Sequence, residues 1–298
     1  MAKHRRYARC QIGVITYYTV NRVKTTVANS LLNVSSYLDR IGYSGSTEPS
    51  AETLCALHRA HMYAVPFENL DIHLGRPIVC DDDRFLHKIV SERRGGFCYE
   101  LNGAFAALLR ALGFDVTLLS ARVTRADGSD GPEFDHLTLR IDLPQRASNE
   151  DLLSGIEQKP HDSWLADVGF GDSFIEPLRL EPGLELPQFG CVYRLLEDDG
   201  DLHMEVMADG KWKREYTFTL QPRRLPDFAA RCHYHQTSPD SHFTRQRICS
   251  RATPNGRISL SDLKLIETRD VQRDEHPLAG EEKWRSTLQK LFGIELPG

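Results

Sequence analysis

The stretch that most constrains this chain is residues 93–102, which read Arg-Arg-Gly-Gly-Phe-Cys-Tyr-Glu-Leu-Asn. A helical pattern follows its cysteine, Cys98. The apolar residues of that pattern are spaced to form one face of a buried helix: Leu101, Phe105, Leu108, Leu109 and Leu112. Gly113 is a stop signal for the helix. We therefore expect Cys98 in the first helical turn, where free N–H groups and the helix dipole favour a thiolate.

The two glycines before Cys98 can be interpreted as room for a substrate to approach the sulfur. On this stretch alone, a second interpretation is equally good. Free cysteine is among the most buried residue types, so Cys98 could be an inert residue of the core.

Two later stretches favour a catalytic role for Cys98. Residues 134–140 and residues 164–171 each read as a strand with an ionisable residue among apolar neighbours, His136 and Asp167 respectively. A cysteine nucleophile needs a base, and the base needs a carboxylate to orient it. Cys98, His136 and Asp167 would supply these roles, although sequence spacing does not show that they meet in space.

Six motifs together resemble those of the arylamine N-acetyltransferases and follow the order of that family. They are residues 37–42, 65–71 and 94–102, the segment around His136, and residues 167–171 and 237–239. The resemblance implies a Cys–His–Asp triad of Cys98, His136 and Asp167. It also implies acetyl-CoA as the acyl donor and aromatic amines or hydrazines as acceptors.

The resemblance extends to binding residues. For CoA it implies Gly169, Phe170, Gly171, Thr237 and Ser238. A Gly-x-Gly segment would let the pyrophosphate approach the backbone, but a simple turn after a strand explains these glycines equally well. For the aryl group it indicates four phenylalanines, whose alternative role is core packing: Phe67, Phe97, Phe170 and Phe243.

The chain divides into four predicted segments. Residues 1–34 are predicted to be a disordered arm or a non-native start, and residues 35–113 a helical domain that carries the nucleophile. Residues 114–221 are rich in strand-forming runs, typical of an antiparallel barrel or sandwich. Residues 222–298 are predicted to form an α/β lid. With the resemblance, we expect an α+β fold: an N-terminal helical bundle, a central antiparallel β-barrel and the lid, with the triad arranged as in cysteine proteases.

Within these segments we expect further details. Residues 145–162 are polar and read as an insertion. After residue 222 the pattern predicts one strand at residues 258–265 and a final helix at residues 281–292.

Composition excludes several classes of protein. The net charge of −5 gives no reason to expect a nucleic-acid partner. No apolar run approaches the roughly 20 residues needed to span a bilayer, so we expect no membrane association. Seven scattered cysteines without a Cys-x-x-Cys pair favour free thiols and a reducing compartment, the cytoplasm. A homo-oligomer is compatible with the sequence.

The sequence contains two groups of potential metal ligands. His58 and His61 have a spacing that could hold a metal, but no third ligand is evident nearby. Residues 232–235, Cys-His-Tyr-His, are followed by His242 and Cys249 at a spacing that fits no common zinc site. We therefore predict no metal.

Three alternatives to acetyl transfer stay open on the sequence. A papain-like or transglutaminase-like thiol hydrolase would use the same triad, and the two activities differ in whether water reaches the acyl-enzyme. A macrolactam-forming amide synthase of the same family would need a different acceptor pocket. A non-catalytic CoA- or aryl-binding protein is disfavoured because all three triad residues are retained.

Overall fold

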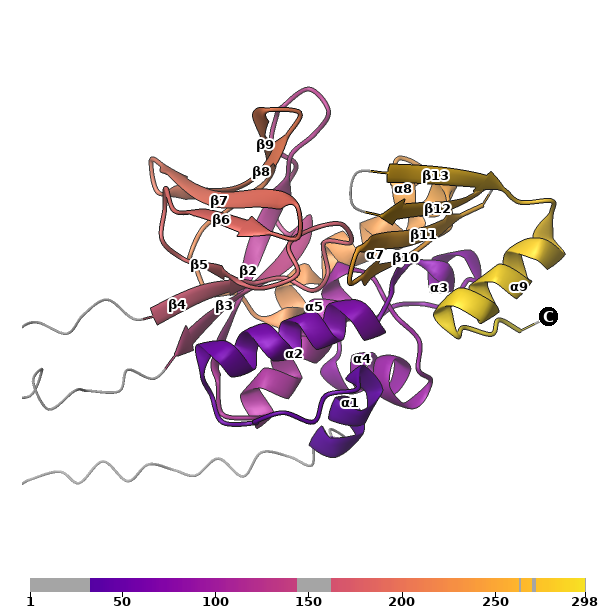
Figure 1. The fold of residues 1–298 in the computed structure, drawn as a ribbon, viewed down its shortest axis with the longest axis horizontal. Coiled ribbons are helices and arrows are strands. Elements are labelled where there is room, and N and C mark those ends of the chain that lie inside the picture. Colours follow the sequence, from indigo (N-terminus) through magenta and orange to yellow (C-terminus); the bar gives the residue numbers. More distant parts are fainter. Residues whose placement is uncertain (1–32, 144–161, 263, 270–271, 298) are drawn as a thin grey trace, which may run out of the picture. The chain divides into compact units, whose positions relative to one another are not determined.

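The computed structural model describes residues 33–143, 162–262, 264–269 and 272–297 (Figure 1). Most of the predicted N-terminal arm, residues 1–34, and of the predicted insertion, residues 145–162, therefore lies outside the described residues.

The first third is helical, as predicted. It contains α1 (Val34–Ile41), α2 (Ala51–Ala64), α3 (Leu70–His73), α4 (Asp82–Leu86), a short π-helix (His87–Ser91) and α5 (Cys98–Ala111). Short polar side chains begin these helices: Ser50 accepts from the Thr53 N–H at 3.2 Å, and Asp81 accepts from the Arg84 N–H at 3.0 Å.

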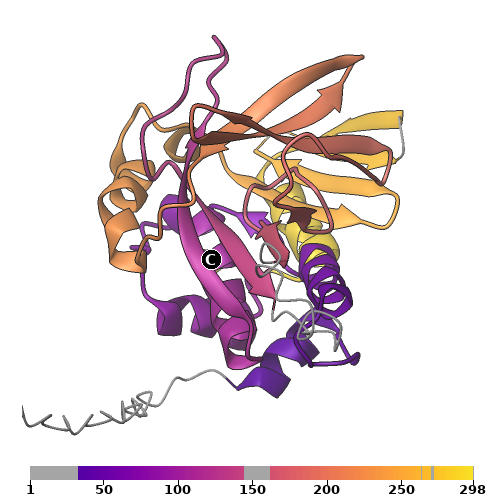
Figure 2. The same cartoon turned by 90° about the vertical axis from the view of Figure 1, so that its left-hand side faces the viewer.

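An eight-stranded antiparallel sheet follows. Its strands are β2 (Asp115–Val123), β3 (His136–Leu143), β4 (Asp162–Ala166), β5 (Leu178–Arg179), β6 (Glu185–Gln188), β7 (Cys191–Asp198), β8 (Asp201–Ala208) and β9 (Lys211–Phe218). Their order is β5-β4-β3-β2-β9-β8-β7-β6. Figures 1 and 2 show α5 beside β2 and β3. The predicted α+β class, with helices and an antiparallel barrel-like sheet, is confirmed.

The C-terminal part begins with a 3-10 turn (Leu225–Phe228), α7 (Ala229–Thr237) and α8 (His242–Arg245). A second sheet has the order β1-β10-β11-β12-β13. Its strands are β1 (Phe67–Glu68), β10 (Ile248–Thr253), β11 (Gly256–Ser261), β12 (Lys264–Arg269) and β13 (Gln272–Pro277), and α9 (Glu281–Phe292) follows.

The prediction of one strand at residues 258–265 is wrong, because the chain turns between Ser261 and Lys264 and forms a hairpin. The Ser261-Asp262 pair is turn-forming, and that local signal outweighs the apolar run around it. The helix predicted at residues 281–292 is α9.

The second sheet joins distant parts of the chain. Phe67 of β1 pairs with Ser250 of β10, and the amide of Asn69 donates to the backbone carbonyl of Phe243 at 3.0 Å. The motif at residues 65–71 is thereby attached to α8 and β10.

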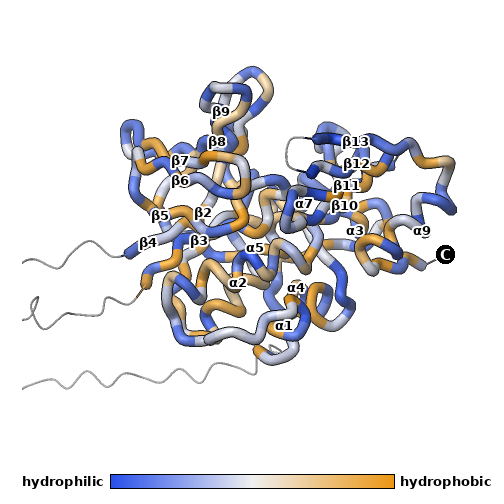
Figure 3. The backbone as a smooth tube through the Cα atoms, viewed as in Figure 1, coloured by the Kyte–Doolittle hydropathy of each residue, from blue (hydrophilic) through white to orange (hydrophobic). Residues whose placement is uncertain are grey.

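The main core lies between the helices and the first sheet. It contains residues of α1, α2, α4, α5, β2 and β3, and it reaches Cys98, Val168 and Phe243. Figure 3 shows a largely hydrophilic β13, whereas apolar residues recur along the elements of this core. Cys98 therefore belongs to this core, and His136 and Asp167 are sequence neighbours of its members Leu137, Ala166 and Val168.

Candidate active site

Cys98 is the first residue of α5, as the helical pattern predicts. Phe97 before it is extended, and the Phe97 N–H donates to Glu100 Oε2 at 3.1 Å. The backbone N–H groups of Leu137 and Tyr99 lie close enough to the sulfur to lower the pKa of its thiol. Since Leu137 directly follows His136, this contact places Cys98 beside the predicted base.

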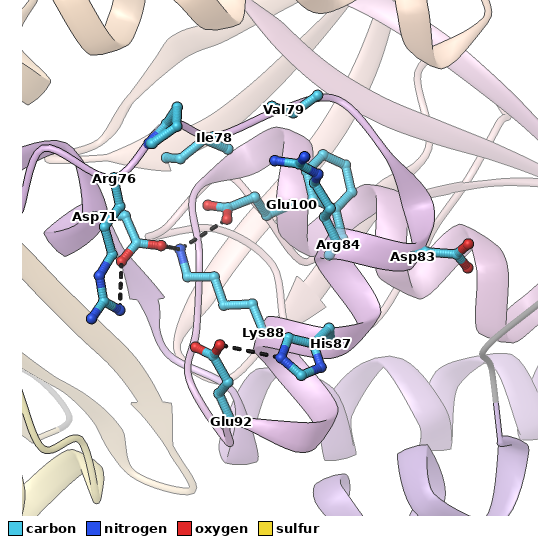
Figure 4. A pocket seen from close by; sticks show the side chains of 12 residues that line it. Asp71, Arg76, Ile78, Val79, Asp83, Arg84, His87, Lys88, Glu92 and Glu100 are labelled. Carbon is cyan, nitrogen blue, oxygen red and sulfur yellow. Dashed lines mark hydrogen bonds and ion pairs between the residues drawn. The ribbon is translucent and has the colours of Figure 1, made fainter.

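A buried network of charges supports this turn (Figure 4). Lys88 Nζ lies 2.8 Å from both Asp71 and Glu100. Arg94 pairs with Glu68 at 2.8 Å and with Asp71 at 3.1 Å. Because Glu100 also accepts the hydrogen bond at the start of α5, the network fixes the turn that presents Cys98.

Gly95 and Gly96, the two glycines before Cys98, allow the backbone to pack closely against neighbouring residues. A Cβ on Gly95 would lie 1.9 Å from the Pro66 carbonyl oxygen, and one on Gly96 would lie 2.7 Å from the Glu100 side chain. The interpretation that they leave room for a substrate at the sulfur is therefore corrected, because neighbouring protein atoms fill that space.

His136 and Asp167 meet in the structure. His136 is the first residue of β3, and Asp167 directly follows β4, whose Ala166 pairs with Leu139. Antiparallel pairing in this register brings the two side chains together, with His136 Nε2 2.6 Å from Asp167 Oδ2. Their exposed fractions are 2% and 0%, against 4% for Cys98. The pair is thus shielded from water.

Asn102 is a further site residue that the sequence analysis did not assign. Its amide nitrogen donates to Asp167 Oδ1 at 2.9 Å and to the Leu137 carbonyl at 2.6 Å. Its amide oxygen accepts from the Val168 N–H at 2.9 Å. A signal was available, because Asn102 follows Cys98 by four residues and therefore lies on the same helix face.

Asp167 is held in its ionised form. Burial raises the pKa of this carboxyl, but the charge and hydrogen bond of His136, together with the Asn102 and Gly169 hydrogen bonds, outweigh burial and leave the pKa below its usual value. A buried carboxylate that keeps its charge can stabilise an imidazolium and fix the ring's orientation.

The environment of Cys98 differs from the prediction. Burial raises the pKa of its thiol well above the usual range, and the carboxylates of Asp167 and Asp135 raise it further. The N–H groups of Leu137 and Tyr99 lower the pKa, but burial outweighs them. The start of α5 alone therefore does not produce a thiolate, which needs a cation such as protonated His136 beside it.

His58 and Gly169 are neighbours of the site residues: His58 contacts the backbone of Asp167, and Gly169 packs on the backbone of Cys98. His58 Nδ1 donates to the Ile175 carbonyl at 2.7 Å, and its Nε2 accepts from the Asp167 N–H at 3.1 Å. Burial lowers the pKa of His58 to about 4, so the ring stays neutral in this role. A Cβ on Gly169 would lie 2.9 Å from the Cys98 backbone, so glycine is required there.

The predicted aryl residues fall into two groups. Phe67 and Phe97 pack on Phe243, with ring centroids 6.1 Å and 5.8 Å apart. Phe170 instead meets the His136 ring edge-on at 5.2 Å. Phe67 also helps line a void of about 10 Å³, together with Gly171. That space holds no more than a water molecule.

Of the remaining predicted CoA residues, Thr237 and Ser238 lie at the end of α7, far from the triad in sequence, whereas Gly171 follows Asp167 by four residues. Thr237 ends α7 and is exposed, and its hydroxyl donates to the His233 carbonyl at 2.8 Å. The Ser238 hydroxyl accepts from the Asp240 N–H at 3.2 Å. Gly171 has a φ of +96°, typical of a turn.

The candidate metal ligands separate in the structure. His61 hydrogen-bonds Tyr37, while His235 pairs with Asp135 at 3.1 Å. Within the described ranges, no group of three His, Cys, Asp or Glu residues is arranged to hold a metal ion. Among those same residues, no helix combines the length and apolar character needed to cross a membrane.

The pocket of Figure 4, about 380 Å³ in volume, adjoins the charged network that supports the Cys98 turn. Its lining includes Lys88 and Glu100 but not Cys98, His136 or Asp167.

Comparison with known proteins gives one consistent result. A family model described as N-acetyltransferase matches residues 50–298. The arylamine N-acetyltransferase pineal gland isozyme NAT-3 of Gallus gallus is 34% identical over 291 residues, covering 89% of this chain and 95% of that protein. The arylamine N-acetyltransferase of Mycolicibacterium smegmatis is 33% identical over 269 residues, covering 89% and 93%. The structure of the Mycobacterium marinum arylamine N-acetyltransferase in complex with CoA superposes with a TM-score of 0.77 at 30% identity, covering 88% and 93%.

Proposed function

The chain belongs to the arylamine N-acetyltransferase family, and on this premise we propose that Cys98, His136 and Asp167 perform its reaction. The enzyme transfers acetyl from acetyl-CoA to the nitrogen of arylamines and arylhydrazines by a ping-pong mechanism. The observation that carries the residue assignment is the buried 2.6 Å contact of His136 with Asp167, beside a cysteine at a helix start.

The first half-reaction begins with a proton transfer from Cys98 to His136. Because burial disfavours an isolated thiolate, the thiolate exists as a pair with the imidazolium, which Asp167 stabilises. The sulfur attacks the thioester carbonyl of acetyl-CoA. The C–S bond to CoA breaks, the CoA sulfur takes the proton from His136, and acetyl-Cys98 is left.

The second half-reaction uses the same groups in reverse. The amine nitrogen attacks the carbonyl of acetyl-Cys98, and its proton passes to His136. An aromatic amine is a weak base and is neutral near pH 7, so it needs no deprotonation before attack. The bond to Cys98 breaks and the amide leaves. Main-chain N–H groups near Cys98 are candidates to stabilise the oxyanion in both steps.

The residues proposed to bind CoA and those proposed to bind the aryl group rest on different observations. For CoA we propose Gly169, Phe170, Gly171, Thr237 and Ser238, and a relative from Mycobacterium marinum is known in complex with CoA. The Gly169 N–H already donates to Asp167 Oδ1 at 3.0 Å, so that group is not free for a pyrophosphate. Gly171 and the residues at the end of α7 are better candidates.

For the aryl group we propose Phe67, Phe97, Phe170 and Phe243. Phe67 and Phe97 both pack on Phe243, and Phe170 packs against His136. An aryl ring bound between these side chains would lie close to the acetyl group.

We further propose that the enzyme works in the cytoplasm. The six cysteines of the described residues are all free thiols, which suits a reducing compartment. Self-association of the chain stays a prediction.

A turnover assay tests the residue assignment. Acetyl-CoA consumption is measured with and without a panel of arylamines and hydrazines, for the wild type, Cys98→Ser and a control, Cys191→Ser, whose cysteine is exposed. We expect acceptor-dependent consumption in the wild type and the control. Loss of Cys98 should reduce it below roughly a hundredth, because serine is not ionised by this pairing. Consumption without any acceptor would instead indicate a hydrolase.

A further inference from the structure

Two cysteines, Cys80 and Cys232, lie at the contact between α7 and residues 78–80. The side-chain amide of Gln236, a residue of α7, forms two hydrogen bonds across this contact. Its Nε2 donates to the Ile78 carbonyl at 2.9 Å, and its Oε1 accepts from the Ile78 N–H at 2.7 Å. The same Nε2 lies 3.3 Å from the sulfur of Cys232, one turn earlier on the helix. These hydrogen bonds of Gln236 therefore hold residues 78–80 against the face of α7 that carries Cys232.

The two thiols lie on the two sides of this contact. Cys232 Sγ lies 3.8 Å from the carbonyl oxygen of Ile78, two residues before Cys80, and the thiols of Cys80 and Cys232 interact closely enough to shift each other's pKa. Cys232 is 1% exposed, whereas Cys80 is half-buried, and both are free thiols. One thiol is thus shielded from solvent, and its partner is open to a reagent from outside.

We propose that Cys80 and Cys232 form a redox-modification site, at which a low-molecular-weight disulfide converts the two thiols into an intramolecular disulfide. Two thiols that interact at this range need only a small displacement to reach the S–S length of about 2.05 Å. The bond would join α7 covalently to residues 78–80, which contribute Ile78 and Val79 to the wall of the pocket in Figure 4.

The chemistry is an exchange in two steps. The Cys80 thiolate attacks one sulfur of the reagent disulfide RSSR, whose S–S bond breaks, and RS⁻ leaves and is protonated. The Cys232 sulfur then loses its proton and attacks the Cys80 sulfur, and the second RS⁻ leaves. In sum, two protein thiols are oxidised to one disulfide while RSSR is reduced to two RSH.

Cys80 is the better first nucleophile for two reasons. It is the more exposed of the two sulfurs. The hydrogen bond from Cys232 lowers the pKa of Cys80 and outweighs burial, while the same contact and burial raise the pKa of Cys232. Cys55 offers a matched comparison, because it is also half-buried but burial raises the pKa of its thiol to about 11.

The test treats the full chain with oxidised glutathione and maps its peptides by mass spectrometry without reduction. We expect one cross-linked pair of peptides containing Cys80 and Cys232, with the loss of two of the seven thiols, reversed by dithiothreitol. Closing a loop of about 150 residues should also raise the thermal midpoint by a few degrees.

Single variants separate this site from general thiol oxidation. With Cys232→Ala, or with Cys232→Ser if alanine fails to fold, glutathione should remain on Cys80 because no second thiol can displace it. In Cys80→Ser, Cys232 should stay unmodified because it is buried. The Cys55→Ser control should cross-link like the wild type. The proposal is overturned if folded wild-type protein gives no Cys80–Cys232 cross-link, or if Cys55 and Cys80 are modified equally without one.

Discussion

Two histidine–aspartate pairs lie next to each other along the chain and are built differently. Asp135 and His136 are consecutive at the start of β3. His136 pairs with Asp167 at 2.6 Å, whereas Asp135 pairs with His235 of α7 at 3.1 Å. Both aspartates lie close enough to Cys98 to raise the pKa of its thiol. Proximity to the cysteine therefore does not distinguish the pairs.

The difference lies in the other partners of each carboxylate. Asp135 also binds the guanidinium of Arg231 at 2.6 Å, a cation that is present at every pH of interest. Asp167 instead receives neutral hydrogen bonds from Asn102 and Gly169. A carboxylate already neutralised by arginine gains little from an imidazolium. The pair with Asp167 is suited to a transient imidazolium, and the pair with Asp135 is suited to anchoring α7.

The largest expected difference between the pairs is in turnover. Asp167→Asn should lower acetyl transfer by about 10² to 10⁴, because its amide can present N–H where the imidazole N–H needs an acceptor. Asp135→Asn should cost less than about tenfold, since its ion-pair partners Arg231 and His235 belong to α7 and not to the triad. Steady-state rates with one arylamine measure both. Equal losses would show that the two pairs do not differ in role.

Alkylation of Cys98 sharpens the contrast, because the two changes should act in opposite directions. Iodoacetamide labelling is followed by peptide mass spectrometry between about pH 5 and 9. Asp167→Asn should slow labelling at low pH, since the imidazolium that supports the thiolate is lost. Asp135→Asn removes a negative charge that raises the pKa of the Cys98 thiol, and labelling should be unchanged or a few-fold faster. A slower rate in both variants would contradict this account.

The smallest effect is on stability, where the pairs should behave alike. The pKa of each carboxyl is lowered in the folded chain, so each ionised group stabilises the fold above its usual pKa. That contribution is lost as pH falls through the lowered folded pKa. Urea unfolding should show each Asn variant roughly 1–3 kcal/mol less stable at pH 7. The gap should shrink below about pH 4. A gap that is constant with pH would rule out the ionised carboxylates as its cause.

Local features of this site were predictable from the sequence, and contacts between distant segments were not. The periodicity after Cys98 predicted where α5 begins, because a helix is encoded by neighbouring residues. The pairing of Asp135 with His235 spans about a hundred residues and leaves no periodic trace. The two-residue strand β1 is likewise recognisable only from its partner β10. The family resemblance supplied the partners that spacing could not.

Burial was the other quantity missing from the sequence. A helix start favours a thiolate, but the surrounding core raises the pKa of the Cys98 thiol, and core packing depends on the whole fold. The glycines at 95 and 96 illustrate the same limit, because their close neighbours are Pro66 and Glu100 rather than an open approach to sulfur.

The most direct test of the central claim is to trap the first half-reaction. The protein is mixed with acetyl-CoA without acceptor, quenched in acid and digested, and the acetylated residue is identified by mass spectrometry. We predict one acetyl group on the peptide that carries Cys98, removed on addition of an arylamine and absent from Cys98→Ser. Acetyl on another residue, or an acetylated Cys98 that an arylamine does not discharge, would contradict the assignment of Cys98 as the nucleophile.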